Sequence, residues 1–267
     1  MLQRTFEKVL IVLAITSVVI ALSSIYVFIV GANPIMPLHI VYFIILVISF
    51  LDSIYAWGII GGLSLFLLAF FIGLFFEIIG VLYGVPFGKY HYTEKIPAKI
   101  IGLVPPDIPL YWFVIIHTSI RITNVISGES ILGSSNLYKR VMISFVDGLC
   151  AVSWDLIMDP IMVNVYHVWV WEKPSGLYGI PLTNFIGWII VVFITSFTFR
   201  TIFHHISNPR ELITPALMYF LLWLVMFLTA IYYGTLYLTP VGSFGMLGFL
   251  TIYGLRLRSF KTTIQNS

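Results

Sequence analysis

Three features of the sequence predict an all-α fold, namely a polytopic integral membrane bundle of about seven or eight transmembrane helices. The 267 residues are 60% hydrophobic and only 9% charged, whereas a soluble domain is usually about a quarter charged. The mean hydropathy is +1.02, and long apolar runs recur along the whole chain. Lipid must therefore solvate most of the exterior, and each spanning segment must satisfy its own backbone hydrogen bonds.

Eight apolar stretches are candidates for spanning helices, since about 20 apolar residues cross a bilayer. The first, 9–30, is longer than the apolar core of a cleavable signal peptide, so we expect it to be retained. The second, 38–52, is short and is expected to be tilted or half-spanning. The others are 57–83, 108–126, 139–160, 181–200, 212–234 and 238–255. No internal repeat or linker separates them, which predicts a single transmembrane domain over 1–267.

The distribution of Lys and Arg predicts a multi-pass protein of the cell membrane with both termini cytoplasmic. With eight spans and a cytoplasmic N-terminus, ten of the 14 basic residues fall on the inner side and four on the outer side, as the positive-inside rule requires. The net charge of +3 is too small to favour a nucleic-acid partner. The only cysteine, Cys150, excludes an internal disulfide.

Two outer connections have unusual compositions. The segment 84–107 is rich in Tyr, Phe, Ile and Val, yet four prolines prevent a regular helix through it. We therefore expect a re-entrant or lid-like connection folded onto the bundle. The segment 161–180 alternates Tyr166, Val168 and Val170 with other residues and then turns through 173–176, which predicts a small hairpin.

Polar residues are expected to converge at the outer end of the bundle. Glu77 lies inside the candidate helix 57–83, and a charge within a span is costly and is a functional candidate by default. Asp155 and Asp159 are one helical turn apart and share a helix face. Asp107 lies at the start of the candidate helix 108–126 and Asn184 at the start of the candidate helix 181–200, again at the outer end. The carboxylate Asp147 is the exception, because it lies deeper in the candidate helix 139–160.

Glu77, Asp155 and Asp159 are the candidate catalytic residues. So many acids at one depth need more counter-charge than the sequence shows, so some are expected to be protonated. A buried, protonated carboxylic acid can protonate an unactivated substrate. We rank Asp155 first, because it follows the aromatic Trp154 and pairs with Asp159. The alternative is structural pairing, for example with Arg121 or with tyrosine hydroxyls.

Aromatic side chains flank the same region and are candidates for substrate binding together with Asp107 and Asn184. Aromatic faces attract cations, so these rings could shelter a carbocation; an interfacial aromatic belt is the alternative. The aromatic candidates are Tyr90, Tyr92, Trp112, Trp154 and Trp188. Three glycines on the face of Glu77 permit a close helix neighbour or leave room for a substrate: Gly73, Gly80 and Gly84.

We predict neither a metal site nor a cofactor. The six histidines do not form the clusters of a membrane di-iron enzyme, and there is no cysteine pair for zinc. No glycine-rich phosphate loop and no serine nucleophile elbow is present. These absences exclude several enzyme classes.

In four ordered motifs, which together span roughly 73–190, the sequence resembles the membrane carotenoid hydratase family (CruF type, bisanhydrobacterioruberin hydratase-like carotenoid biosynthesis proteins). The motifs cover 77–92, 109–112, 154–160 and 178–188. The resemblance implies a carotenoid or other polyisoprenoid lipid as partner and the addition of water to the terminal trisubstituted double bond of an acyclic carotenoid end. The product would be a tertiary alcohol, formed without an organic cofactor.

Two alternatives stay open. The D-x-x-x-D spacing of Asp155 and Asp159 could hold Mg²⁺ and a diphosphate, as in a Mg-dependent membrane prenyltransferase. Carboxylates within spans could also relay protons in a proton-coupled transporter, although no internal repeat supports this. The sequence determines neither the exact carotenoid nor the oligomeric state.

Overall fold

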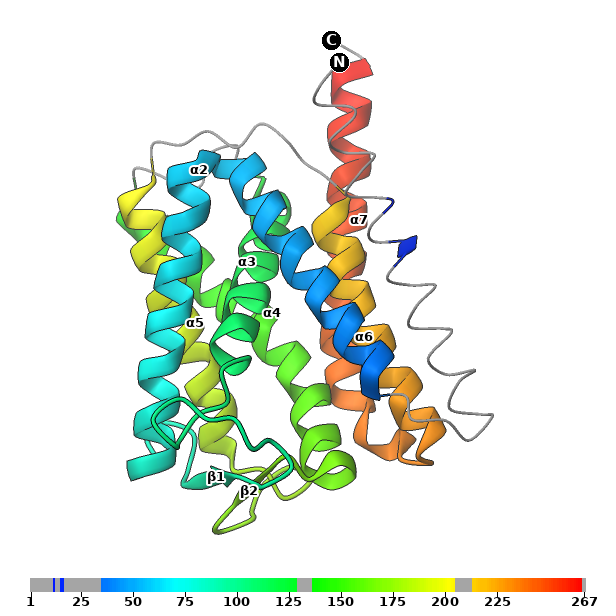
Figure 1. Ribbon diagram of the computed structural model, residues 1–267. Helices are drawn as coiled ribbons and strands as arrows, with labels where there is room; N and C mark the ends of the chain where they lie inside the picture. Colours follow the sequence, from blue (N-terminus) through cyan, green and yellow to red (C-terminus); the bar gives the residue numbers. More distant parts are fainter. Residues whose placement is uncertain (1–11, 13–14, 17–34, 129–135, 205–212, 266–267) are drawn as a thin grey trace.

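The computed structural model is an all-helical bundle, and it describes residues 12, 15–16, 35–128, 136–204 and 213–265 (Figure 1). The predicted first span, 9–30, lies almost wholly outside these residues. The elements in chain order are helices α2 (Ile35–Tyr83), α3 (Ile108–Ser127), α4 (Leu137–Ile161), α5 (Leu182–Ile202), α6 (Thr214–Tyr232) and α7 (Pro240–Gln265), with strands β1 (Tyr90–Tyr92) and β2 (Trp169–Trp171) and short helical turns Met162–Tyr166 and Leu236–Leu238.

Helix α2 is a helical hairpin. Its backbone leaves the helical region at Gly58, where φ is 73° and ψ is 171°, a conformation open to glycine because it has no Cβ. The chain therefore reverses direction there, and the two legs diverge from this point as separate helices (Figure 1). These legs correspond to the predicted segments 38–52 and 57–83, although the first leg is longer than the sequence suggested.

Four of the described helices are long and apolar enough to cross a membrane: Val41–Tyr83, Leu137–Tyr166, Leu182–Ile202 and Thr214–Tyr232. Large apolar side chains such as Phe71, Phe75 and Phe244 are exposed on the outside, as expected where lipid replaces water. Helices α3 to α6 match the predicted segments to within two residues. The total of seven or eight spans stays a prediction.

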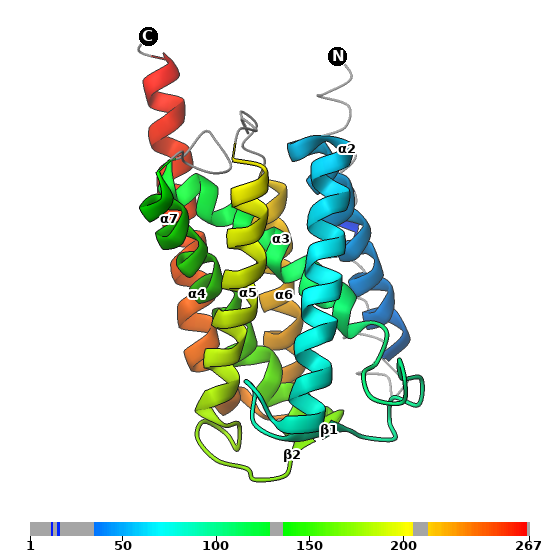
Figure 2. The ribbon, with the colours of Figure 1, turned by 90° about the vertical axis from the view of Figure 1, so that its left-hand side faces the viewer.

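Helix α3 is the central helix of the bundle. It contacts α2, α4, α5, α6 and α7, and nearly every side chain from Trp112 to Val125 is buried. Figure 2, turned by a quarter from Figure 1, shows α3 enclosed by the other helices. Polar side chains on α3 therefore face protein on all sides and need partners from neighbouring helices.

The two outer connections meet at one end of the bundle in a two-stranded antiparallel sheet (Figures 1 and 2). Strand β1 pairs with β2 in the register Tyr90 with Trp171 and Tyr92 with Trp169. The hairpin predicted within 161–180 is wrong, because its strand pairs with the other connection instead. All four of these aromatic side chains are buried, so burial on the end of the bundle selects this pairing.

The segment 84–107 packs against the end of the bundle through the buried side chains of Phe87, Tyr90, Tyr92 and Val104. Its lysines are held locally: Lys89 pairs with Glu172 at 3.3 Å, and Lys99 Nζ donates to the backbone carbonyl of Tyr92 at 3.0 Å. A re-entrant or lid-like role for this segment stays a prediction.

Candidate functional site

A cavity of about 690 Å³ lies between the helices beneath the β1–β2 sheet. Most of its wall is apolar, and its polar lining includes Glu77, Asp107, Asp159 and Asn184. All five aromatic residues singled out in the sequence line it as well: Tyr90, Tyr92, Trp112, Trp154 and Trp188. The predicted site residues thus meet at one place, with the exception of Asp155, which does not line the cavity.

Glu77, near the C-terminal end of α2, accepts hydrogen bonds from three side chains. One carboxylate oxygen accepts from Trp112 Nε1 at 2.9 Å. The other accepts from the hydroxyl of Tyr92 at 2.7 Å and also from the hydroxyl of Tyr90. Burial and the adjacent Glu77 carboxylate raise the pKa of both tyrosines well above the usual value. Both tyrosines therefore remain hydroxyl donors, so Glu77 is held by three donors from two other elements.

The approach of these donors depends on the glycines that share the face of Glu77. A Cβ at Gly73 would lie 2.6 Å from Trp112 Cδ1, and a Cβ at Gly80 would lie 2.8 Å from Phe87 Cδ2 and 3.0 Å from Tyr90 Cε1. The expected close helix neighbour is therefore confirmed for Gly73, whereas Gly80 contacts side chains of the segment 84–107. Small residues let α3 and β1 come close enough to α2 to reach Glu77.

Asp155 and Asp159 in α4 form a second polar cluster with Asn184 of α5. The Asn184 side-chain amide donates to Asp155 Oδ2 at 3.0 Å and to Asp159 Oδ2 at 2.6 Å. Asp155 is fully buried, Asp159 is 3% exposed, and Asp155 Oδ1 has no hydrogen-bond partner within the described part of the chain. Both carboxyls bond to one amide nitrogen, and repulsion between two negative charges at such a separation disfavours ionising both.

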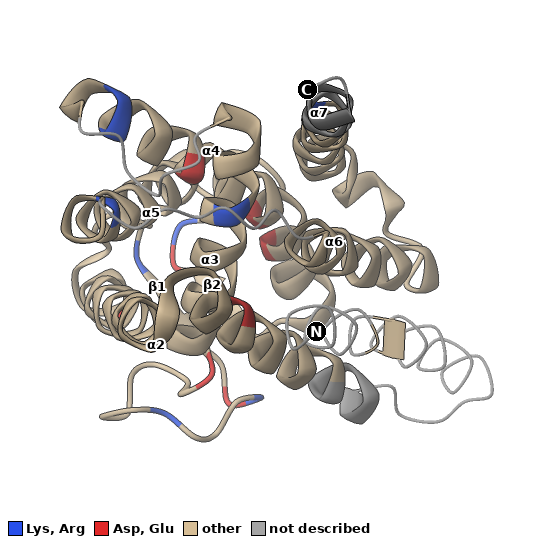
Figure 3. Ribbon diagram, turned by 90° about the horizontal axis from the view of Figure 1, so that it is seen from above, with Lys and Arg blue, Asp and Glu red and all other residues tan. Residues whose placement is uncertain are grey.

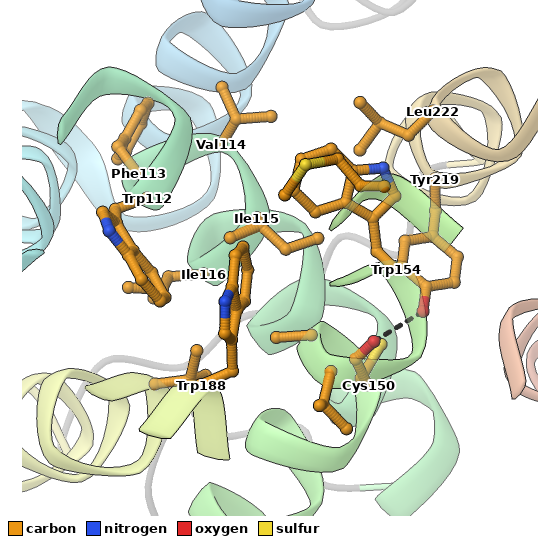
Figure 4. Close-up of a cluster of buried hydrophobic side chains, with 14 of the residues drawn as sticks. Trp112, Phe113, Val114, Ile115, Ile116, Cys150, Trp154, Trp188, Tyr219 and Leu222 are labelled. Atoms are coloured by element: carbon orange, nitrogen blue, oxygen red, sulfur yellow. Dashed lines mark hydrogen bonds between the residues drawn. The ribbon is translucent and has the colours of Figure 1, made fainter. Parts of the chain in front are cut away.

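Three tryptophans form a continuous wall between the two clusters. The rings of Trp112 and Trp188 have centroids 4.3 Å apart, and those of Trp188 and Trp154 are 5.8 Å apart. Figure 4 shows Trp112, Trp188 and Trp154 projecting from α3, α5 and α4 toward the same interior space. At one end of the wall, Trp112 donates to Glu77. At the other end, Trp154 is the residue that precedes Asp155.

Sequence reasoning missed a buried charge cluster that lies apart from the cavity. Asp52 Oδ2, on the first leg of α2, contacts both Arg121 Nε and His117 Nε2 at 2.9 Å. All three residues are buried, and Arg121 pairs with Asp52, a carboxylate that was not among the candidates. The available signal was that His117 and Arg121 lie one turn apart in an apolar helix and require a counter-charge.

A second buried network surrounds Asp147. Arg200 Nε donates to Asp147 Oδ2 at 2.9 Å, and Arg200 Nη1 donates to Asn124 at 2.7 Å. Thr123 also hydrogen-bonds Asp147. Figure 3 shows acidic and basic positions within the helices in the interior of the bundle. Arg121 and Arg200 are buried with carboxylates, so they do not report on membrane orientation. Without these two, the predicted inner side holds eight basic residues and the outer side four.

Comparisons with known proteins agree with this picture. The model of a family described as "Carotenoid biosynthesis protein" matches residues 35–251. A bisanhydrobacterioruberin hydratase of Haloarcula japonica is 26% identical over 115 residues, which is 43% of this chain and 36% of that protein. This chain thus aligns with about a third of the length of that curated relative. No solved structure matches. Because the family match covers most of the chain, the protein belongs to the family of carotenoid biosynthesis proteins.

Proposed function

We propose that the protein is a membrane carotenoid hydratase, which adds water to the terminal trisubstituted double bond of an acyclic carotenoid end by acid catalysis. The observation that carries this proposal is the buried pair Asp155 and Asp159, bridged by Asn184 beside an aromatic, largely apolar cavity. An apolar cavity suits a hydrocarbon end group, and the family and the hydratase relative support a carotenoid substrate.

The first step is proton transfer to the alkene. Asp159 lines the cavity, so it donates the proton that it shares with Asp155. The proton adds to the CH carbon of the double bond, and the positive charge develops on the tertiary carbon. Asp155, ranked first from the sequence, does not line the cavity. In this mechanism it shares the proton with Asp159 before the transfer, and the negative charge that the transfer leaves is spread over both carboxyls.

The cation is then sheltered and quenched. The faces of Trp112, Trp188 and Trp154 stabilise the tertiary cation, and the low polarity around them strengthens that attraction. A water oxygen forms the new C–O bond, and one of its O–H bonds breaks as Glu77 takes the proton. Return of this proton to the aspartate pair completes the cycle, so that one water is added and no proton is consumed.

The test is hydration by single variants in a host that makes the acyclic carotenoid and lacks its own hydratase. Asp159→Asn keeps shape and hydrogen bonding but removes the acid, and we expect a loss of about a hundredfold or more. Glu172→Gln is the matched control, because its side chain is 49% exposed and pairs with Lys89 outside the cavity. Mass analysis counts the waters added per end, at equal protein levels in the membrane.

Near-normal hydration by Asp159→Asn would remove Asp159 as the donor. Asp155→Asn and Glu77→Gln then decide between the other two carboxyls by the same assay. If the wild-type protein adds no water to any acyclic carotenoid, the hydratase proposal itself fails.

The runner-up is a Mg-dependent membrane prenyltransferase. Asp155 and Asp159 are one turn apart on α4, and Lys95 lines the same cavity, where it offers a positive charge to a diphosphate. Dependence of activity on a divalent metal separates the two functions, because acid catalysis by the aspartate pair requires no ion.

A further inference from the structure

The proposed mechanism uses one group of the polar side chains that line the cavity and leaves a second group unused. The second group, here called the tyrosine group, comprises Tyr42, Tyr111, Tyr166 and Tyr233, and all four line the cavity. They come from the first leg of α2, from α3, from the turn after α4 and from the end of α6. Four distant parts of the chain thus place phenol rings at one part of the cavity.

Contacts join the tyrosine group into one cluster. The rings of Tyr42 and Tyr111 meet edge to face at 5.5 Å, and those of Tyr166 and Tyr233 do so at 5.8 Å. Both pairs line the same cavity, which brings the four rings together. Lys95 Nζ donates to the backbone carbonyl of Tyr166 at 2.7 Å, so the loop above is fixed to the same cluster.

The hydroxyl of Tyr42 is the feature that points to a ligand. Its oxygen is buried and has no hydrogen-bond partner among the described residues, although the ring lines the cavity. An unpaired buried hydroxyl is costly, and a bound O–H group removes that cost. Buried water molecules occupy pockets that have room for them and that offer several polar groups as hydrogen-bond partners.

The tyrosine group also reaches the surface, because Tyr233 is 41% exposed. The catalytic end of the cavity is covered by the sheet, whose Trp169 and Trp171 are buried. Hydration consumes one water for each end, so the site needs a polar entrance. We infer that the tyrosine group is the binding site through which the reactant water enters and waits, with Tyr42 as its central hydrogen-bond partner. This inference rests on the proposed function.

Occupancy by water is tested without any activity. X-ray radiolysis generates hydroxyl radicals from bound water, and mass spectrometry measures the oxidation rate of each tyrosine in the membrane-embedded protein. Tyr219 is the control, because it is fully buried outside the cavity and donates to the backbone carbonyl of Cys150 at 2.6 Å (Figure 4). We expect Tyr42, Tyr111 and Tyr166 to oxidise several-fold faster than Tyr219. Equal rates would overturn the inference.

The role of that water is tested by kinetics. Tyr42→Phe removes one oxygen and keeps the ring packed on Tyr111, whereas Tyr237→Phe removes an exposed hydroxyl outside the cavity. We expect Tyr42→Phe to lower kcat several-fold with KM for the carotenoid unchanged, and Tyr237→Phe to change neither. A raised KM with normal kcat would mean that Tyr42 binds a group of the carotenoid substrate. Unchanged kinetics would mean that Tyr42 binds nothing that the reaction requires. Either result overturns the inference.

Discussion

Replacing Gly73 with Ala tests whether close packing of α3 on α2 holds the site together. The added Cβ would lie 2.6 Å from Trp112 Cδ1, 2.7 Å from Trp112 Cγ and 2.9 Å from Trp112 Cβ. The Trp112 Cβ is fixed to the backbone, so a new side-chain rotamer alone does not relieve the overlap. The helix α3 must move away from α2, and Trp112 must move with it.

The size of the effect follows from these distances. Carbon atoms pack at roughly 3.5–4.0 Å, so the ring must shift by about 1 Å. The hydrogen bond from Trp112 Nε1 to Glu77 is 2.9 Å long, and a shift of this size breaks it. Overpacking costs about 1–3 kcal/mol of stability, and a 1 Å misplacement at a catalytic site costs activity on the order of a hundredfold.

The assay is hydration in the carotenoid-producing host, with thermal stability of the purified protein measured in parallel. Gly248→Ala is the matched control, because it lies in helix α7 with no atom within 4 Å of its new Cβ; we expect normal activity. Trp112→Phe separates the causes, since it removes the N–H donor without overlap. Normal hydration by Gly73→Ala would refute the claim that packing at this glycine positions Trp112 on Glu77.

Three other perturbations test the fold and the proposed chemistry. Activity should survive EDTA, because acid catalysis uses only protons; full loss with rescue by Mg²⁺ would favour the prenyltransferase. Arg200→Met should destabilise the protein by about 3–5 kcal/mol, because the buried Asp147 loses its counter-charge; the Arg200→Met, Asp147→Leu double variant should recover much of this in a thermal melt. In a cysteine-free background, cysteines introduced for Lys95 and Phe260 should label from opposite sides of the membrane; labelling from one side would contradict the eight-span topology.

The sequence alone determined the class of the fold and where most of its helices begin and end. A chain with 9% charged residues has too little polar surface for water, and the lengths of its apolar runs mark out helices. The spacing of Asp155 and Asp159 by itself places both on one helix face, since helical geometry brings residues four apart together. Local chain geometry accounts for all of these predictions.

Only the tertiary structure decided which side chains meet across helices. Nothing local to Glu77 shows that Trp112 and two tyrosines of a distant strand donate to it, or that Asp159 but not Asp155 lines the cavity. The partner of Arg121 and the pairing of β1 with β2 were likewise hidden. The physical reason is that sequence periodicity assigns a residue to a face of its own helix, whereas the rotation and depth of each neighbouring helix are set by packing of the whole bundle.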